Sequence, residues 1–271
     1  MELGAKRDIS TTKCPKYEIG QCSDVGLVRS INEDSLLTLN FDNAGLSDLK
    51  VSLYAIADGL GGYRGGDIAS KIALKVLTDN ISKFILSTAS QTDIHNQKLV
   101  LEALTVGVMA ANNEVVSQGL AHGNNMATTL VTALLINDNA YIANVGDSRA
   151  YCLDEVQIHQ ITVDHSLVAK LVESGEIRPE ELYTHPQRNI VTRWLGSQLN
   201  IEVDLFNELL NPNKSLILCS DGLWEMVKDF NIEKIIREQS TAQEACMQLV
   251  NMAKQNGGLD NISVIIVKVL S

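Results

Sequence analysis

Hydrophobic residues follow two different periods along this chain of 271 residues. Short apolar runs, alternating or continuous, predict strands, because side chains of a strand point to opposite faces in turn. Segments of this kind, bounded by turn-forming residues, occur at 17–22, 35–40, 51–57, 128–136, 140–145, 150–153, 156–161, 201–207, 215–219 and 262–269. They predict a protein rich in strands.

Apolar residues spaced three and four apart predict helices over 67–86 and 97–118. Ser166 can cap a short helix that Gly175 closes, and short helical pieces extend to about residue 238. The clearest helix comes last, where Ser240 and Gln243 are placed as a capping box. The first helix should face the core with these positions: Ile68, Ile72, Ala73, Val76, Leu77, Ile81 and Phe84.

The order of these elements predicts an α+β fold. Strand runs and helix pairs alternate irregularly and are joined by short hairpins, which indicates antiparallel sheets covered by helices. A doubly wound parallel sheet is disfavoured, because strands and helices do not alternate regularly and no G-x-G-x-x-G fingerprint is present. Residues 176–200 contain two prolines and a glycine, and we expect an irregular excursion, or flap, between core elements.

Four acidic residues stand at the ends of predicted strands. Asp58 and Asp221 follow strands and precede glycine, whereas Asp34 and Asp260 come just before strands. In an antiparallel sheet the end of one strand lies beside the start of its neighbour, so these acids can share one rim. Like charges gathered there raise one another's pKa and require a counter-ion. Carboxylate oxygens favour hard divalent cations such as Mn²⁺ or Mg²⁺.

The composition is that of a globular protein that does not bind nucleic acid. Apolar residues make up 45% and charged residues 20%, as in an ordinary globular protein. No linker divides the chain, so we expect one domain over 15–271, after a flexible tail over 1–14, and a monomer. The net charge of −11 argues against nucleic acid as a partner.

The absence of targeting segments and the pattern of cysteines both indicate a protein of the cytoplasm. We see neither a secretion signal nor a run of about 18 apolar residues, so we expect no membrane partner and a cytoplasmic location. The five cysteines are odd in number and show no C-x-x-C pairing, which suggests neither a disulfide scaffold nor a zinc site. Cys219 is interpreted as a small core residue rather than a nucleophile.

Taken in order, the motifs resemble the metal-dependent Ser/Thr protein phosphatases of the 2C family, in their compact bacterial form. The resemblance runs from about residue 17 to 269. The matching segments are 23–34 (SDVGLVRSINED), 57–62 (ADGLGG), 126–129 (MATT), 146–149 (GDSR), 185–193 (HPQRNIVTR), 220–224 (SDGLW) and 260–263 (DNIS). Each motif alone is weak, but the set in this order is specific.

The resemblance implies two packed antiparallel sheets flanked by helix pairs, with metals in a cleft at one rim. It implies that Asp58 bridges two Mn²⁺ or Mg²⁺ ions, that Gly59 offers its carbonyl, and that Asp221 and Asp260 complete one site. Two cations roughly 4 Å apart can activate a bridging water for in-line attack on phosphorus. The implied substrates are proteins phosphorylated on serine or threonine, and the implied partner is an opposing kinase.

Further residues take roles from the same resemblance. Glu33 and Asp34 would hold metal-bound waters, and Asp147 with Asp221 would form a third, weaker metal site. Arg29 would supply a planar guanidinium for two phosphate oxygens, a geometry that lysine cannot match. Each of these residues also has an interpretation without a catalytic role. Glu33 could be a solvated acid, Asp147 could belong to a simple Gly-Asp-Ser turn, and Arg29 could be a surface arginine.

The general acid is left open. Tyr63 stands where bacterial relatives commonly carry histidine, and His185, in the excursion, is a candidate substrate contact or a packing residue. A pseudophosphatase would have lost a metal acid, and here none is missing. A regulatory switch with the same fold and a non-enzymatic cation-binding protein also stay open, although no D-x-D-x-D-G calcium loop is found.

Overall fold

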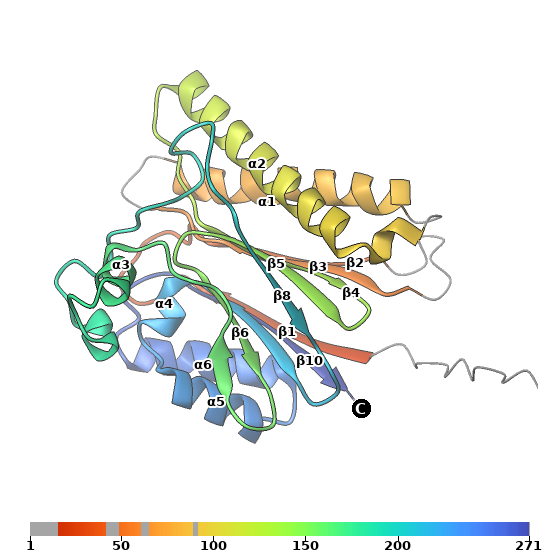
Figure 1. Ribbon diagram of the computed structural model, residues 1–271. Helices are drawn as coiled ribbons and strands as arrows, with labels where there is room; N and C mark the ends of the chain where they lie inside the picture. The colour runs from red at the N-terminus through yellow and green to blue at the C-terminus, as the bar shows by residue number, and fades with distance from the viewer. Residues whose placement is uncertain (1–15, 42–48, 61–64, 89–91, 271) are drawn as a thin grey trace, which may run out of the picture.

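The computed structural model describes residues 16–41, 49–60, 65–88 and 92–270. Two five-stranded sheets pack face to face, and helices cover the outer face of each, as Figure 1 shows. The strand pairs within both sheets are antiparallel. The α+β class predicted from the sequence is confirmed, and so is the four-layer sandwich of packed antiparallel sheets and flanking helices that the resemblance implies.

Sheet A has the strand order β1-β10-β9-β6-β7. Its strands are β1 (Lys16–Asp24), β6 (Arg149–Leu153), β7 (Ile158–Gln160), β9 (Ser215–Cys219) and β10 (Ile262–Leu270). The first and last of the described strands thus pair with each other, from Lys16 opposite Leu270 to Asp24 opposite Ile262. This pairing brings segments more than 200 residues apart to the same rim.

Sheet B has the strand order β2-β3-β4-β5-β8. Its strands are β2 (Ser35–Asn40), β3 (Val51–Ala57), β4 (Leu130–Ile136), β5 (Asn139–Val145) and β8 (Asp204–Leu209). The hairpin expected between β4 and β5 is present, with Asn137 at a φ of 53° in its turn. The chain passes from sheet B to sheet A between β5 and β6.

Helices α1 (Gly66–Thr88) and α2 (Gln97–His122) lie on sheet B, and α4 (Asp221–Trp224), α5 (Asp229–Glu238) and α6 (Ala242–Gln255) lie on sheet A. The short helix α3 (Leu167–Glu173) and two 3₁₀ turns, η1 (Thr92–His95) and η2 (Pro179–Tyr183), complete the helical elements of the described ranges. Ser166 caps α3, because its hydroxyl accepts from Ala169 N–H at 3.2 Å. This cap was expected.

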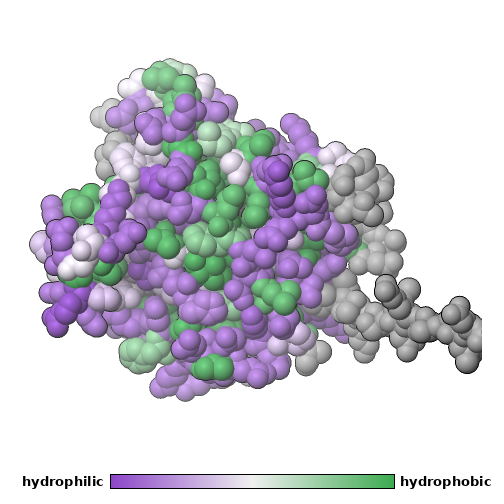
Figure 2. Space-filling model, in the orientation of Figure 1, coloured by the Kyte–Doolittle hydropathy of each residue, from purple (hydrophilic) through white to green (hydrophobic). Residues whose placement is uncertain are grey.

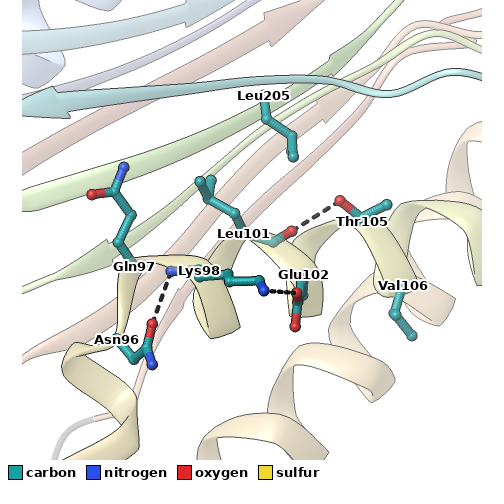
Figure 3. A pocket seen from close by; sticks show the side chains of 8 residues that line it. All are labelled: Asn96, Gln97, Lys98, Leu101, Glu102, Thr105, Val106 and Leu205. Carbon is teal, nitrogen blue, oxygen red and sulfur yellow. Dashed lines mark hydrogen bonds and ion pairs between the residues drawn. The ribbon is translucent and has the colours of Figure 1, made fainter.

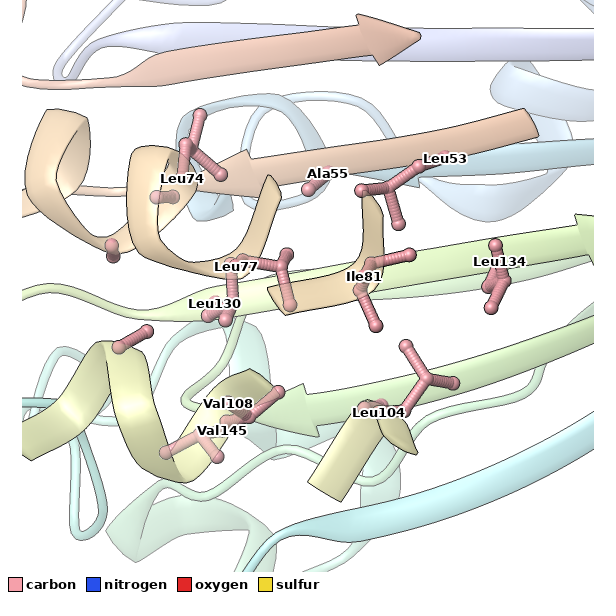
Figure 4. Close-up of a cluster of buried hydrophobic side chains, with 14 of the residues drawn as sticks. Leu53, Ala55, Leu74, Leu77, Ile81, Leu104, Val108, Leu130, Leu134 and Val145 are labelled. Carbon is pink, nitrogen blue, oxygen red and sulfur yellow. The ribbon is translucent and has the colours of Figure 1, made fainter. Parts of the chain in front are cut away.

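Three apolar layers hold the sandwich together. Side chains of α1 and α2 interleave with those of β3, β4 and β5 in Figure 4, where Leu77 and Leu104 face Leu130 and Leu134. A second layer lies between the two sheets, and a third lies between sheet A and α4–α6. Burying apolar area of this kind stabilises the fold by about 25 cal/mol for each Å² removed from water.

Two details of the helices differ from the sequence-based expectation. The capping box of α6 is formed by Thr241 and Glu244, one residue later than the expected Ser240 and Gln243, because the chain enters the helix one residue further on. Ile68 is 46% exposed, since the buried face of α1 is turned toward Ala69, Ala73 and Leu77. The apolar spacing was right, but it did not determine which flank of the stripe meets the sheet.

Helix α2 is long and apolar enough to cross a membrane by length and composition. Its apolar face, however, packs on α1 and sheet B, with Val100, Leu104 and Val108 buried. Its hydropathy is thus that of a core helix in this fold.

Candidate active site

Sheet B contributes two acids to one rim of the sandwich. The β2–β3 register places Ser35 opposite Ala57, so Asp34 and Asp58, the next residues outward, are neighbours. Both are largely buried, with 8% and 9% of their surface exposed. The adjacency expected from antiparallel pairing is therefore present.

Sheet A contributes acids to the same rim. Asp221 comes two residues after the end of β9 and is the first residue of α4. Asp260 lies two residues before the start of β10, the strand that pairs with β9. Asp147, 3% exposed, lies in the turn that carries the chain from β5 of sheet B to β6 of sheet A. The two sheets thus deliver their acids to a common place.

The acids raise one another's pKa. Burial, and then the charges of Asp34 and Asp221, hold the pKa of Asp58 well above its usual range. Burial, and then the charges of Asp147 and Asp260, do the same for the pKa of Asp221. Burial also raises the pKa of Asp34 to about 6 and that of Asp147 to about 7. Carboxyls that influence one another this strongly form a single cluster.

Two carboxylate oxygens of the cluster lack the partners that buried oxygens normally have. Ser220 Oγ donates to Asp34 Oδ2 at 2.9 Å. Asp34 Oδ1 and Asp221 Oδ1 are buried and accept no hydrogen bond from the described residues. Buried anionic oxygens without donors are the ligands that a hard cation takes, so the residues present fit a divalent metal centre.

The backbone of Asp58 is held by two threonines of the segment 126–129. Thr128 Oγ1 donates to the carbonyl of Asp58 at 2.9 Å. Thr129 makes two further bonds to the same residue. Its N–H donates to the Asp58 carbonyl at 2.8 Å, and its Oγ1 accepts from Asp58 N–H at 3.2 Å. No role could be assigned to this motif from the sequence, and in the structure its threonines position Asp58.

Gly59 is glycine because the chain passes too close for a side chain. A Cβ there would lie 2.4 Å from the carbonyl oxygen of Gly66 and 2.7 Å from that of Glu33. The carbonyl of Glu33 also accepts from Gly59 N–H at 3.3 Å and from Ser70 Oγ at 2.7 Å. Glu33 is half-buried, and burial is the main cause that raises its pKa. The start of α1 therefore locks the strand-end glycine in place.

Asn261 is a positioning residue that sequence reasoning missed. Its amide nitrogen donates to the carbonyls of Val25 and Ile31, at 3.0 and 2.9 Å, and its Oδ1 accepts from Glu33 N–H at 2.8 Å. These three bonds fold the loop that presents Arg29. The signals in the sequence were its place directly after Asp260 and its inclusion in the matching segment 260–263.

Arg29 and Asp260 meet at the mouth of a cleft. Arg29 Nη2 donates to Asp260 Oδ2 at 2.6 Å, and this bond is the main cause that raises the pKa of the guanidinium. Asp58, Gly59 and Asp221 line the same cavity, whose volume is about 320 Å³. A guanidinium has five N–H donors, so donors remain for a ligand in this cavity.

The excursion forms the facing wall of the cleft. Asn189, Ile190, Val191 and Trp194 line the cavity from that side. The segment is anchored by Leu195, whose N–H and carbonyl pair with Thr128 at 2.9 and 3.2 Å. A single threonine thus fixes both Asp58 and the wall opposite it.

A buried ion pair supports the turn that carries Asp147. Trp224 Nε1 donates to the carbonyl of Asp147 at 3.0 Å, and the Arg149 guanidinium lies 3.5 Å from the Trp224 ring centroid. Arg149 is in turn bonded to both oxygens of Asp164 by its Nε and Nη2, at 2.6–3.2 Å. Breaking such a pair by removing one partner leaves a buried charge, so the turn is rigidly held.

Three expectations from the sequence have different outcomes. Tyr63 lies outside the described residues. His185 is not among the residues that line the cavity, and its Nδ1 accepts from Gln187 N–H at 3.2 Å, so a substrate contact stays a prediction. Cys219 is fully buried, and burial raises the pKa of its thiol, which agrees with a core role.

A larger cavity, about 860 Å³, lies between the start of α2 and β8. In Figure 3, Leu205 of β8 faces Leu101 of α2, and Figure 2 shows apolar side chains gathered at the centre of this face. Its charged lining residues, Lys98 and Glu102, pair with each other at 3.8 Å. The cavity therefore offers no chemistry comparable to that of the acidic cleft.

Residues 30–258 match the family Protein phosphatase 2C. The chain belongs to this family. Members of the family are protein serine/threonine phosphatases, and this chain is one. Its metal dependence and its use of phosphorylated proteins as substrates follow from that membership.

Individual relatives of this 2C-type phosphatase agree with the assignment. The chain is 37% identical over 251 residues to the serine/threonine phosphatase stp of Listeria monocytogenes serotype 4b, covering 91% of this chain and 93% of the relative. It superposes on the S. agalactiae serine/threonine phosphatase with a TM-score of 0.81 at 32% identity, covering 94% and 100% of the two chains. The catalytic domain of the phosphatase PstP, solved in complex with two manganese ions, has a TM-score of 0.78 at 28% identity, covering 94% and 99%.

Proposed function

We propose that the phosphatase uses a binuclear centre of Mn²⁺ or Mg²⁺ in the acidic cleft. Asp58 would bridge two ions, with Gly59, Asp221 and Asp260 as further ligands and with Asp34 and Glu33 holding bound waters. Asp147 and Asp221 would form a third, weaker site. The observation that carries the proposal is the pair of buried oxygens on Asp34 and Asp221 for which the described residues supply no hydrogen-bond donor. Such ions, when bound, activate a bridging water for in-line attack on phosphorus and neutralise the phosphate charge.

The residues of the chain would orient the substrate. Arg29 lies at the cleft mouth beside Asp260, where a forked guanidinium can hold two oxygens of a phosphoseryl or phosphothreonyl group. Ile190 and Val191 of the excursion face it and limit the access of water. The proposed role is signalling, in which a monomer in the cytoplasm opposes a Ser/Thr kinase.

The test is a count of bound ions joined to an assay. Equilibrium dialysis of the purified protein with Mn²⁺ should show two ions bound tightly, and phosphate release from a phosphothreonine peptide should rise with occupancy of the second. Full activity at one bound ion would contradict a binuclear centre. A third, weaker ion should disappear in Asp147→Ala, while the two tight ions remain.

Replacing Arg29 by alanine should lower kcat/KM for phosphopeptides by about 10²-fold, because a bidentate, charge-assisted contact to phosphate is lost. Arg29→Lys keeps the positive charge but loses the forked geometry of the guanidinium, so its activity should lie between those of the wild type and Arg29→Ala. Steady-state kinetics measures the effect. Arg237→Ala removes a partly exposed arginine paired with Glu233 on α5 and serves as the matched control. Equal losses in Arg29→Ala and Arg237→Ala would refute the contact.

In the chelated protein, the melting temperature should be higher at about pH 5.5 than at about pH 7.5. The pKa values of Asp34 and Asp147, raised to about 6 and about 7, exceed the unfolded value of about 3.9. Between those values the folded state binds more protons, so stability falls as pH rises through this window. Calorimetry measures the difference.

Saturating Mn²⁺ should reduce this pH dependence, because a cation replaces the protons. Asp34→Asn should also reduce it in the chelated protein, whereas Asp138→Asn, which changes an exposed acid in the β4–β5 turn, should leave it unchanged. A chelated protein that becomes more stable toward pH 7.5 would contradict the raised pKa values.

A further inference from the structure

Three side chains with metal-binding atoms meet at the edge where the two sheets adjoin, in a place the catalytic cleft does not use. They are Cys152 of β6, His159 of β7 and Glu208 of β8, and their ligand atoms all lie within 4.8 Å of one another. Cys152 and His159 are directly opposite in the β6–β7 ladder. Glu208 comes from the edge strand of the other sheet. No short stretch of sequence could have indicated this group.

The carboxylate of Glu208 already has two hydrogen-bond partners, the Cys152 thiol and the Lys214 ammonium. Glu208 Oε1 accepts from Lys214 Nζ at 2.7 Å, so one carboxylate oxygen is already paired. Glu208 Oε2 is 3.8 Å from His159 Nε2, which is too long for a hydrogen bond. Cys152 is fully buried, whereas the His159 side chain is 40% exposed, so the group can be reached from solvent on the histidine side.

The simplest interpretation of the group is a weak histidine–glutamate pair beside a buried thiol, with no metal ion. Tetrahedral zinc, with bonds of about 2.0–2.3 Å, needs ligand atoms roughly 3.3–3.6 Å apart, so separations of at most 4.8 Å would have to shorten by up to about 1.5 Å. Rotations of the partly exposed His159 and Glu208 side chains can supply such a movement. We propose that Cys152, His159 and Glu208 form a binding site for a zinc-class ion, with a water as the fourth ligand.

The ligand set separates this site from the catalytic cleft. A thiolate and an imidazole favour Zn²⁺ and similar ions, while Mn²⁺ and Mg²⁺ prefer the oxygen ligands of the acidic cluster. Burial, and then the charge of Glu208, raise the pKa of the Cys152 thiol to about 12. Binding of the ion therefore displaces the thiol proton to solvent, and the ion's charge stabilises the thiolate that remains.

The site would tie the two sheets together at the two ends of the segment 161–203, which contains α3 and the excursion. Strand β7 is the last strand before residues 161–203 and β8 the first after them, and each is an edge strand of its sheet. An ion held by both strands binds the folded state and not the unfolded chain, so it stabilises the sandwich at this edge.

Co²⁺ tests the site, because a thiolate ligand gives it a charge-transfer band in the near ultraviolet. The experiment uses the full chain with excess Mg²⁺ to occupy oxygen ligands. We expect the wild type to develop the band with one equivalent of Co²⁺, Cys152→Ser to lack it, and His159→Gln to bind Co²⁺ about tenfold more weakly or worse. Cys246→Ser and His95→Gln, a buried cysteine and an exposed histidine outside the group, should retain the wild-type band. No band in the wild type, or an unchanged band in Cys152→Ser, would overturn the proposal.

A thermal measurement covers the case in which Cys152→Ser fails to fold. Zn²⁺ at about 100 times its dissociation constant should raise the melting temperature of the wild type by about 5 °C, in the presence of Mg²⁺. His159→Gln changes a partly exposed side chain, and circular dichroism can verify its fold. A rise in the wild type that is absent in His159→Gln supports the site, whereas equal rises in both proteins would reject it.

Discussion

Removal of divalent cations with EDTA is expected to abolish hydrolysis of phosphoserine and phosphothreonine peptides. Asp34, Asp58, Asp147 and Asp221 lie in one buried cluster, and each pKa is raised by burial and by the neighbouring negative charges. A metal centre supplies several kcal/mol of charge stabilisation, and each 1.36 kcal/mol corresponds to a tenfold change in rate. Its loss should therefore lower kcat by about 10³-fold or more.

Addition of Mn²⁺ or Mg²⁺ to the chelated enzyme should restore activity, as measured by phosphate release. The restoration excludes irreversible unfolding as the cause of the loss. Circular dichroism of the EDTA-treated protein provides the second control, since the three apolar layers do not depend on the cleft. Undiminished turnover in excess EDTA would show that the cluster does not act through a metal.

Asp221→Asn is expected to remove nearly all turnover, with a loss in kcat on the order of 10³-fold. Asparagine keeps the size of the side chain and one oxygen, but it removes the negative charge at a position where Oδ1 is buried without a donor among the described residues. The same change lowers the mutual repulsion with Asp58 and Asp147, so the metal-free variant should be at least as stable as the wild type.

Asp138→Asn is the matched control for this experiment. It changes the same side chain at an exposed position in the β4–β5 turn, far along the strands from Asp147, and it should retain wild-type kinetics. Steady-state rates on one phosphopeptide, with thermal melts of both variants, measure the two effects separately. Wild-type rates in Asp221→Asn would remove Asp221 from the metal centre.

The meeting of the acids at one rim could be argued from the sequence. Alternating apolar runs located the strands, and an antiparallel register places the residue before one strand next to the residue after its partner. Ser35 opposite Ala57 in the structure is that arrangement, and it makes Asp34 and Asp58 neighbours. Ser215–Cys219 was located to the residue, because its apolar run ends sharply at Ser220 and Asp221.

The supporting hydrogen bonds could not be predicted. Thr128 holds Asp58 across 70 residues of sequence, and Asn261 holds Ile31 across 230. A threonine or asparagine carries no local mark of a partner so remote, because its hydrogen-bonding groups are the same in a turn or at the surface. The shift of the α6 cap to Thr241 shows a smaller limit, since Ser240 and Thr241 are chemically similar capping residues.

What the sequence by itself determined is local: the period of each apolar run, the acids at strand ends and the residues that can begin or end helices. These features reflect the fixed geometry of strands, helices and turns. Only the tertiary structure decided how the two sheets share one rim, how Leu195 brings the excursion to Thr128, and how Cys152, His159 and Glu208 meet where the edges of the two sheets adjoin. Those contacts depend on which faces pack together, and packing is a property of the whole apolar core rather than of any segment.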